Sequence, residues 1–211
     1  MSNRNVVSAE RPPAEKPSGV RRTAARYFTR PVVRLLVRTP LTPNTLTWLG
    51  FVIAMGAGAL AATGHLFVAG FVVLFGGLFD TLDGALARST NRVTRFGAVL
   101  DSTLDRLGEA AVLLGLLLLY AGEQSTAGVL IASLALIGSP LVSYVRSRAE
   151  GLGLKCEVGL LTRTERVIVL ALGLLLSQID YVLIAALAII AALSFVTVGQ
   201  RLFHVWRETR D

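Results

Sequence analysis

Four aspartates stand at the ends of two long apolar stretches, where carboxylates are costly and therefore point to a function. Asp80 and Asp83 are three residues apart, and Asp101 and Asp105 are four residues apart. At 3.6 residues per turn, the members of each pair lie on one face of a helix. We therefore expect two helices to bring four carboxylates together.

Four carboxylates in one apolar pocket repel one another strongly unless cations of comparable total charge lie among them. The candidate ligands are all oxygen atoms, and no His or Cys stands near them in the sequence. Such a ligand set suits Mg²⁺, with Mn²⁺ as a substitute, and does not suit zinc or copper. The sequence predicts two divalent ions, whose charges balance the four carboxylates.

Three residues beside the acids point to a phosphate group. Gly84 and Gly97 have no side chain, so a phosphate or a facing helix can approach the backbone closely there. Arg88 follows Gly84 by one helical turn and can hold a phosphate with its planar guanidinium. Together with paired metals, these residues predict a diphosphate site.

The stretch from Asp80 to Asp105 reads D-x-x-D-G-x-x-A-R, eight residues, then G-x-x-x-D-x-x-x-D. It resembles the signature of the CDP-alcohol phosphotransferases at every fixed position and with the expected gaps. The resemblance implies that Asp105 is the general base. It also implies that two Mg²⁺ ions sit on the diphosphate of a CDP-linked lipid, held by Asp80, Asp83, Asp101 and Asp105.

A short polar segment before the first apolar stretch, residues 41–47, has two interpretations. Pro43 forms a turn there, and Asn44 is a candidate N-cap for the helix that follows. In the resembling family, a Pro-Asn/Asp-x-x-Thr segment at this place helps to bind the CDP group. The resemblance therefore implies that the CDP-lipid contacts are Asn44, Thr45, Leu46, Thr47, Gly84, Arg88 and Thr94.

The composition predicts an all-α integral membrane protein. Of the 211 residues, 53% are hydrophobic, and the net charge is +7, with a mean hydropathy of +0.62. The expected partner is the lipid bilayer and not a nucleic acid. Six apolar segments approach the length of about 20 residues that crosses a bilayer. We place these six transmembrane helices at residues 44–63, 66–88, 96–120, 126–150, 163–178 and 181–203.

The segments that precede and follow the six spans are more polar than the spans. Residues 1–20 are rich in Pro, Ser, Glu and Arg, which predicts a disordered cytoplasmic tail. In residues 21–39, arginines recur every fourth position among apolar residues, which predicts an amphipathic juxtamembrane helix at the membrane surface. The remaining segments are the six-helix catalytic domain at residues 40–206 and a cytoplasmic tail at residues 207–211.

The positions of Lys and Arg predict the orientation in the membrane. Three connections, near His65, Glu123 and Asp180, contain neither residue, whereas the segments at the opposite ends of the spans are basic. Positive charge favours the cytoplasmic side. We therefore expect a multi-pass protein of the cell membrane whose two termini and acidic site face the cytoplasm.

Glu109 follows Asp105 by four residues and continues the acidic face one turn deeper. We expect it to be the partner of Arg106 or of another polar group. Direct binding of a metal ion is the alternative.

Several arginines in the second half stand at or inside the span ends, where an unpaired guanidinium is costly. The strings around them, S-Y-V-R-S-R-A-E, R-T-E-R and Q-R-L, resemble the branch of the family that makes phosphatidylinositol phosphate. The resemblance implies an acceptor alcohol that carries its own phosphate. Its predicted contacts are Arg146, Arg163, Arg166 and Arg201.

The resulting hypothesis is transfer of a phosphatidyl group from CDP-diacylglycerol to inositol 1-phosphate, with release of CMP. Glycerol 3-phosphate, the acceptor of a phosphatidylglycerophosphate synthase, suits the same arginines. A membrane prenyltransferase also binds a diphosphate through aspartates, but it lacks this framework of glycines and Arg88. A cation transporter needs no arginine beside the acids, and the sequence shows no inverted repeat. Members of the resembling family are usually homodimers, and both diacyl and ether lipids fit the donor.

Overall fold

The computed structural model describes residues 33–37, 39–90 and 92–210, and within these ranges the regular structure is entirely helical. The all-α prediction is therefore confirmed. Beside the short helical stretch at residues 33–37, the order is α2 (Pro43–Ala62), α3 (Leu66–Ser89), α4 (Arg95–Gly122), α5 (Thr126–Gly151), α6 (Arg163–Leu175) and α7 (Val182–Glu208).

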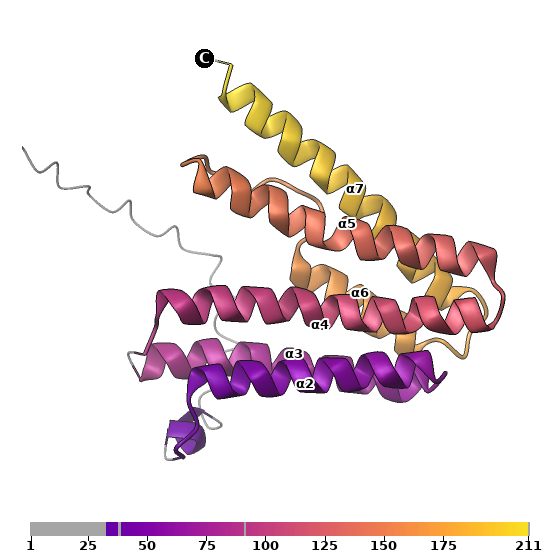
Figure 1. The fold of residues 1–211 in the computed structure, drawn as a ribbon, viewed down its shortest axis with the longest axis horizontal. Helices are drawn as coiled ribbons and strands as arrows, with labels where there is room; N and C mark the ends of the chain where they lie inside the picture. The colour runs from indigo at the N-terminus through magenta and orange to yellow at the C-terminus, as the bar shows by residue number, and fades with distance from the viewer. Residues whose placement is uncertain (1–32, 38, 91, 211) are drawn as a thin grey trace, which may run out of the picture.

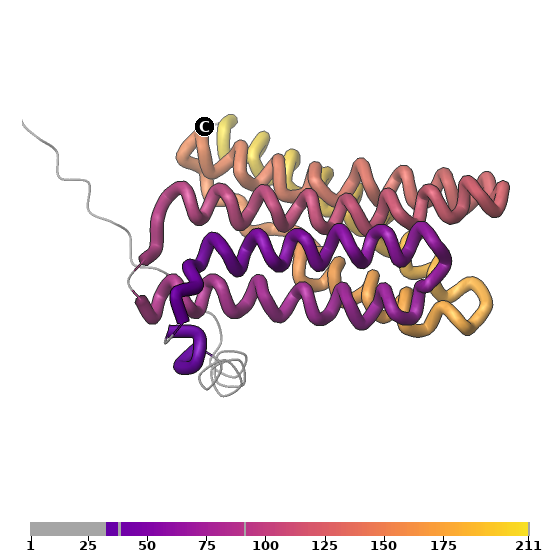
Figure 2. The backbone as a smooth tube through the Cα atoms, turned by 60° about the horizontal axis from the view of Figure 1, so that its bottom comes forward, coloured from indigo at the N-terminus to yellow at the C-terminus, as the bar shows by residue number. Residues whose placement is uncertain are grey.

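The helices form a bundle in which α2, α3 and α4 run side by side, while α7 crosses at a steeper angle (Figure 1). Helix α2 packs against both α3 and α4, α5 packs against α4 and α7, and the short α6 packs against α3 and α7. In the turned view, the two connections at residues 62–66 and 122–126 lie at one end of the bundle (Figure 2). The acid-bearing end of α3 and the start of α4 therefore meet at the other end.

Small residues allow the closest of these helix contacts. A Cβ atom added at Gly58 of α2 would lie 2.5 Å from the carbonyl oxygen of Ala111 of α4, and one added at Gly70 of α3 would lie 2.9 Å from Leu175 of α6. Only glycine permits this approach, which is a common way to pack helices in lipid. The core between the helices is apolar and includes Leu113, Leu116, Leu174, Leu187 and Ile190.

Four of the described helices, α2, α3, α5 and α7, are long and apolar enough to cross a membrane. The chain is therefore a multi-pass, membrane-embedded protein. Helix α4 differs because Asp105, Arg106 and Glu109 interrupt its apolar stretch. Helix α6 has 13 residues, which span about 20 Å at 1.5 Å per residue, whereas the apolar core of a bilayer is about 30 Å thick.

Most predicted span ends agree with the observed helix ends within two residues, and larger differences occur only in the last two spans. Helix α6 ends at Leu175, three residues before the expected end of the fifth span. Helix α7 continues to Glu208, so the predicted tail at residues 207–211 begins inside a helix whose last turn contains Arg207. A basic side chain there interacts favourably with the helix dipole. The predicted tail at residues 1–20 and most of the amphipathic segment lie outside the described residues.

The N-cap of α2 is Thr42 and not Asn44. The Thr42 hydroxyl accepts a hydrogen bond from the backbone N–H of Thr45 at 3.2 Å, and Pro43 occupies the first helical position. Proline suits that position because its φ angle is already helical and no N–H is needed there. Asn44 is thus inside the first turn, and its side chain is free of the capping role.

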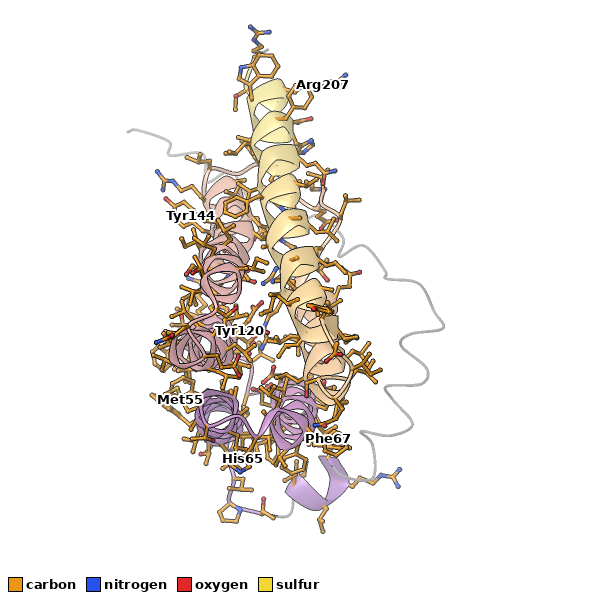
Figure 3. All side chains as sticks on the ribbon, turned by 90° about the vertical axis from the view of Figure 1, so that its right-hand side faces the viewer. Met55, His65, Phe67, Tyr120, Tyr144 and Arg207 are labelled. Atoms are coloured by element: carbon orange, nitrogen blue, oxygen red, sulfur yellow. The ribbon has the colours of Figure 1, made fainter. Side chains whose placement is uncertain are left out.

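Figure 3 views the bundle from the end at which α2 is connected to α3. His65, Phe67 and Tyr120 lie at the end that faces the viewer in this figure, where α2 is connected to α3 and α4 to α5. The His65 ring forms a 3.0 Å hydrogen bond with the Thr63 hydroxyl, and neither residue lines the pockets at the acids. This end therefore supplies no part of the site.

Candidate active site

The four aspartates belong to the last turns of α3 and the first turns of α4. The connection between these helices is short, so the two helices run in opposite directions and their charged ends lie together. Thr94 begins α4 as its N-cap, and its hydroxyl accepts a hydrogen bond from the N–H of Gly97 at 2.9 Å. This cap fixes where the helix starts and so fixes the turns on which Asp101 and Asp105 stand.

Arg163, the first residue of α6, joins the two helices at the acids. Its Nη2 atom lies 2.7 Å from Oδ2 of Asp80 and 2.8 Å from Oδ1 of Asp105. Two of the four predicted metal ligands therefore already share one positive charge. The sequence interpretation placed this arginine at the acceptor phosphate and did not foresee its contact with the acids.

Helix α2 holds the acids from the other side. Asp83 is buried, and its Oδ2 accepts a 2.8 Å hydrogen bond from the Thr47 hydroxyl. Gly50 lies beside Asp80, because an added Cβ would be 3.4 Å from Oδ1 of that residue. Such contacts fix the orientation of a carboxylate before any ligand binds.

The donor set fits hard divalent cations, since it consists of carboxylate oxygens and lacks nitrogen or sulfur. Within the described ranges, no three side chains of His, Cys, Asp or Glu are grouped closely enough to hold a metal ion as they stand. Instead, a guanidinium supplies the positive charge at Asp80 and Asp105. The site is thus one in which cations are stabilised. The residues that would hold the ions are Asp80, Asp83, Asp101 and Asp105.

A pocket of about 280 Å³ opens beside Asp83 and Asp101. A side chain at Gly84 would come within 3.3 Å of the Arg88 guanidinium, and one at Gly97 would come within 3.2 Å of the Asn44 amide oxygen. The glycines therefore keep the pocket open. Of the predicted CDP-lipid contacts, it brings together Asn44, Thr47, Gly84, Arg88 and Thr94.

Two predicted CDP-lipid contacts do not line this pocket. Thr45 forms a 2.8 Å hydrogen bond with Thr42 at the start of α2. Leu46 is buried, with only 2% of its surface exposed. Both residues stand on the faces of α2 that turn away from the pocket, because a helix directs successive residues about 100° apart.

A second pocket, of about 400 Å³, lies on the other side of Asp105. Most of the residues that line it are polar, and they include Ser102, Ser143 and Ser147. The four arginines predicted to bind the acceptor come together there, although they belong to three helices: Arg146, Arg163, Arg166 and Arg201. We call this space the acceptor pocket and the previous one the donor pocket.

The arginines of the acceptor pocket have different partners. Arg146 is exposed and pairs with Glu150 of its own helix at 2.8 Å. Arg201 is buried and donates from Nε to the carbonyl oxygen of Val158 at 2.8 Å and from Nη1 to that of Val142. Arg201 is therefore fixed in place by backbone groups, whereas Arg146 can move.

Glu109 pairs with Arg166 and not with Arg106. The Arg166 guanidinium donates from Nε to Oε1 at 2.8 Å and from Nη2 to Oε2 at 3.0 Å, and the Ser139 hydroxyl adds a 2.8 Å bond to Oε1. Arg106 turns the other way and donates to the carbonyl oxygen of Ser102 at 2.5 Å. The expected polar partner thus exists, but it comes from α6.

A model of the CDP-alcohol phosphatidyltransferase family matches residues 40–199 of the chain. The chain belongs to this family. The resemblance seen in the aspartate motif is confirmed, and the chain is an enzyme of the phosphatidyltransferase class. Family membership decides against the prenyltransferase and the cation transporter.

Relatives within the family include an archaetidylinositol phosphate synthase of Methanothermobacter thermautotrophicus, which is 38% identical and is matched over 86% of this chain and 94% of its own length. A crystal structure of the phosphatidylinositol phosphate synthase of Mycobacterium tuberculosis with CDP-DAG bound has a TM-score of 0.80 and 37% identity, covering 85% of this chain and 94% of that one. The same synthase in complex with manganese and citrate gives a TM-score of 0.79 at 38% identity, covering 84% and 88%.

For this family member, sequence reasoning missed residues whose contribution depends on packing. Ser139 supports Glu109 from α5, thirty positions further along the chain. Ser102 and Arg106 line the acceptor pocket because they share the face of α4 that carries Asp105. The helical periodicity around Asp105 could have indicated Ser102 and Arg106, whereas no local pattern marks Ser139.

Proposed function

We propose that this phosphatidyltransferase moves a phosphatidyl group from CDP-diacylglycerol to the hydroxyl of inositol 1-phosphate and releases CMP, as a step of phospholipid biosynthesis. The observation that carries the proposal is the acceptor pocket, in which four arginines and Asp105 meet. A phosphate is the group that such an arginine cluster stabilises best. The relatives whose names specify an inositol phosphate product support the same acceptor.

The donor pocket provides for the nucleotide end of the lipid. Arg88 and the N-terminal turn of α2 line it, and Gly84 leaves room for the diphosphate beside the acids. Divalent ions held by the four aspartates, two in our proposal, would neutralise the diphosphate and stabilise the departing CMP. A neighbour solved with manganese supports a divalent ion, with Mg²⁺ as the proposed resident metal.

Asp105 stands where the two substrates meet. Its carboxylate contacts Arg163 beside the other aspartates, and it also lines the acceptor pocket. In the proposed reaction it accepts the proton of the acceptor hydroxyl as the oxygen attacks the lipid-linked phosphorus. The bond from that phosphorus to CMP breaks in the same step. Holding both substrates in line supplies much of the rate enhancement, and no covalent enzyme intermediate is required.

The proposal also covers the arrangement in the membrane. All six helices, including the charged α4 and the short α6, form the transmembrane domain at residues 40–206, with the amphipathic segment 21–39 at its surface. Both termini and the two pockets face the cytoplasm, because the basic residues gather at that end. The enzyme acts as a homodimer.

The decisive experiment measures CMP release by the purified protein with CDP-diacylglycerol and a panel of acceptors. We expect inositol 1-phosphate to be used well and plain inositol poorly. Preference for glycerol 3-phosphate would reject the acceptor and keep the family chemistry. The same assay with a CDP-linked ether lipid distinguishes a diacyl donor from an archaeal-type donor.

A further inference from the structure

Arg163 lies between the aspartates, which attract cations, and the acceptor pocket, which attracts anions. On one side its guanidinium holds the carboxylates of Asp80 and Asp105. On the other side the same side chain lines the acceptor pocket, beside Arg146 and Arg201. A cation in this position can serve either the acids or an anion in the pocket, but not both in full.

The contact with the acids leaves Arg163 incompletely bonded. Both carboxylates are contacted through Nη2, while Nε is buried and lacks a hydrogen-bond partner within the described residues. A buried donor without a partner costs free energy. Arg166 also has a buried nitrogen without a partner in the described residues, but only 1% of its side chain is exposed. Because 31% of the Arg163 side chain is exposed, it can leave its arrangement at modest cost.

The backbone beneath Arg163 stays fixed when the side chain moves. Thr162 and Glu165 form a reciprocal capping box at the start of α6, and the N–H of Thr162 donates to Glu165 at 2.6 Å. One turn further, Arg166 holds α6 to α4 through Glu109. The guanidinium can therefore turn about its own side-chain bonds without moving the helix.

A divalent ion at the acids and the guanidinium compete for the same oxygens. Each would contact Asp80 and Asp105, and two cations only a few ångströms apart repel strongly in a pocket of low dielectric constant. Binding of such an ion would therefore release Arg163. The nearest place that accepts a released guanidinium is the acceptor pocket that it already lines.

We propose that Arg163 is exchanged between the two sites: it is the counter-ion of Asp80 and Asp105 before a divalent ion binds, and it holds the acceptor phosphate afterwards. The identity of that acceptor rests on the function proposed above. The exchange makes the metal a prerequisite of the complete acceptor pocket. Because linkage is reciprocal, acceptor binding must also strengthen metal binding.

The first experiment measures Mn²⁺ binding to the purified full-length chain without lipid or acceptor, by the electron paramagnetic resonance signal of free Mn²⁺. Replacing Arg163 with Gln removes the competing charge and should tighten Mn²⁺ binding at least about tenfold. Arg163→Lys keeps the charge but not the two-acid contact, so its affinity should fall between those of the parent and the Gln variant. Thermal unfolding establishes that each variant is folded.

The matched control is Arg106→Gln, which removes one positive charge from the same pocket. Arg106 donates to a backbone carbonyl and to Ser147, and it makes no contact with an acid in the described part of the chain. Its Mn²⁺ affinity should stay within about threefold of the parent value. If Mn²⁺ binding tightened equally in both Gln variants, the cause would be the lower positive charge of the pocket in general. That result would overturn the exchange.

The second experiment repeats the Mn²⁺ titration with inositol 1-phosphate or glycerol 3-phosphate present. In the parent, the accepted phosphate compound should tighten Mn²⁺ binding, and in Arg163→Gln most of this gain should disappear. The same gain in parent and variant, or unchanged Mn²⁺ affinity in Arg163→Gln, would overturn the exchange. A gain with glycerol 3-phosphate alone would support the exchange and reject the acceptor of the proposed function.

Discussion

Two arginine–carboxylate pairs join α6 to α4 one helical turn apart, and their surroundings are opposite. Asp105–Arg163 lies at the pockets, with 14% and 31% of the two side chains exposed, whereas Arg166 and Glu109 are 1% and 5% exposed. We call Arg166–Glu109 the inner pair and Asp105–Arg163 the outer pair. In the inner pair the guanidinium donates to both carboxylate oxygens, and the Ser139 hydroxyl donates a further hydrogen bond. In the outer pair, Arg163 is shared with Asp80. Each arginine keeps one buried nitrogen without a hydrogen-bond partner among the described residues, Nε in Arg163 and Nη1 in Arg166.

The difference shows how one kind of interaction can serve either structure or function. A buried pair is costly to break, because removing one partner leaves an uncompensated charge in the interior. A partly exposed pair with shared bonds is cheap to rearrange. We therefore assign the inner pair to the position of α6 and the outer pair to the chemistry at the acids.

The largest effect on activity is expected from replacing one of the four aspartates. Asp80→Asn removes a carboxylate that contacts Arg163 and that we propose as a metal ligand, so metal-dependent CMP release should fall to background. Removal of divalent ions with a chelator should have the same effect on the parent. The variant should remain folded, because loss of one charge also relieves repulsion among the acids. Full activity in chelator would contradict the metal model.

The inner pair should instead affect stability. Arg166→Ala leaves Glu109 buried without its partner and should lower the free energy of unfolding by about 3–5 kcal/mol. Replacing both residues together, as Glu109→Leu with Arg166→Met, should recover most of this loss, since no unpaired charge remains. Unfolding by denaturant in detergent provides the measurement. A double variant no more stable than Arg166→Ala would show that the pair contributes more than mutual neutralisation.

Replacing Asp105 should lower turnover without a large loss of stability. Asp105→Asn should reduce turnover at least about a hundredfold, the usual scale for loss of a general base. The affinity for CDP-diacylglycerol should survive, and the melting temperature should change less than in Arg166→Ala. Single-turnover CMP release and lipid binding can be measured on the same preparation. Nearly normal turnover would reassign the base.

The smallest effects should come from Arg146 and Arg201, which line the acceptor pocket and contact none of the four aspartates in the described residues. Arg146→Ala should weaken acceptor binding by about 1.5–3 kcal/mol, the value of a charge-assisted hydrogen bond, with little change in stability because the residue is exposed. Arg201→Ala should weaken acceptor binding similarly and also lower stability, since its carbonyl partners are left unbonded. In both variants the preference for inositol 1-phosphate over inositol should shrink. Equal use of both acceptors by the parent would remove the phosphate-binding role from these arginines.

Much of the fold could be predicted because a bilayer constrains a chain strongly. Each apolar stretch must become a helix to satisfy its own backbone hydrogen bonds. The start of α3 at Leu66, of α5 at Thr126 and of α6 at Arg163 agrees with the sequence prediction. The helix ends were less predictable, since the end of α6 at Leu175 and the extension of α7 to Glu208 depend on packing and end effects and not on hydropathy.

The candidate site divides in the same way. Local spacing predicted that the aspartate pairs share helix faces and that Gly84 and Arg88 are one turn apart, because a helix has a fixed period. Those residues gather at the donor pocket and at the neighbouring contact between Asp80 and Arg163. Local spacing could not predict that Arg163 reaches Asp80, which lies 83 positions earlier in the chain.

The sequence by itself thus determined the helices, the family and the acids, since each depends on neighbouring residues or on a short motif. The tertiary structure alone decided which partner each arginine takes. Four guanidiniums with the same chemistry end with two acids, one buried glutamate, two backbone carbonyls and one exposed glutamate, for Arg163, Arg166, Arg201 and Arg146 respectively. The physical reason is that a long charged side chain is satisfied by whatever packing brings within reach, and no local pattern contains that distance.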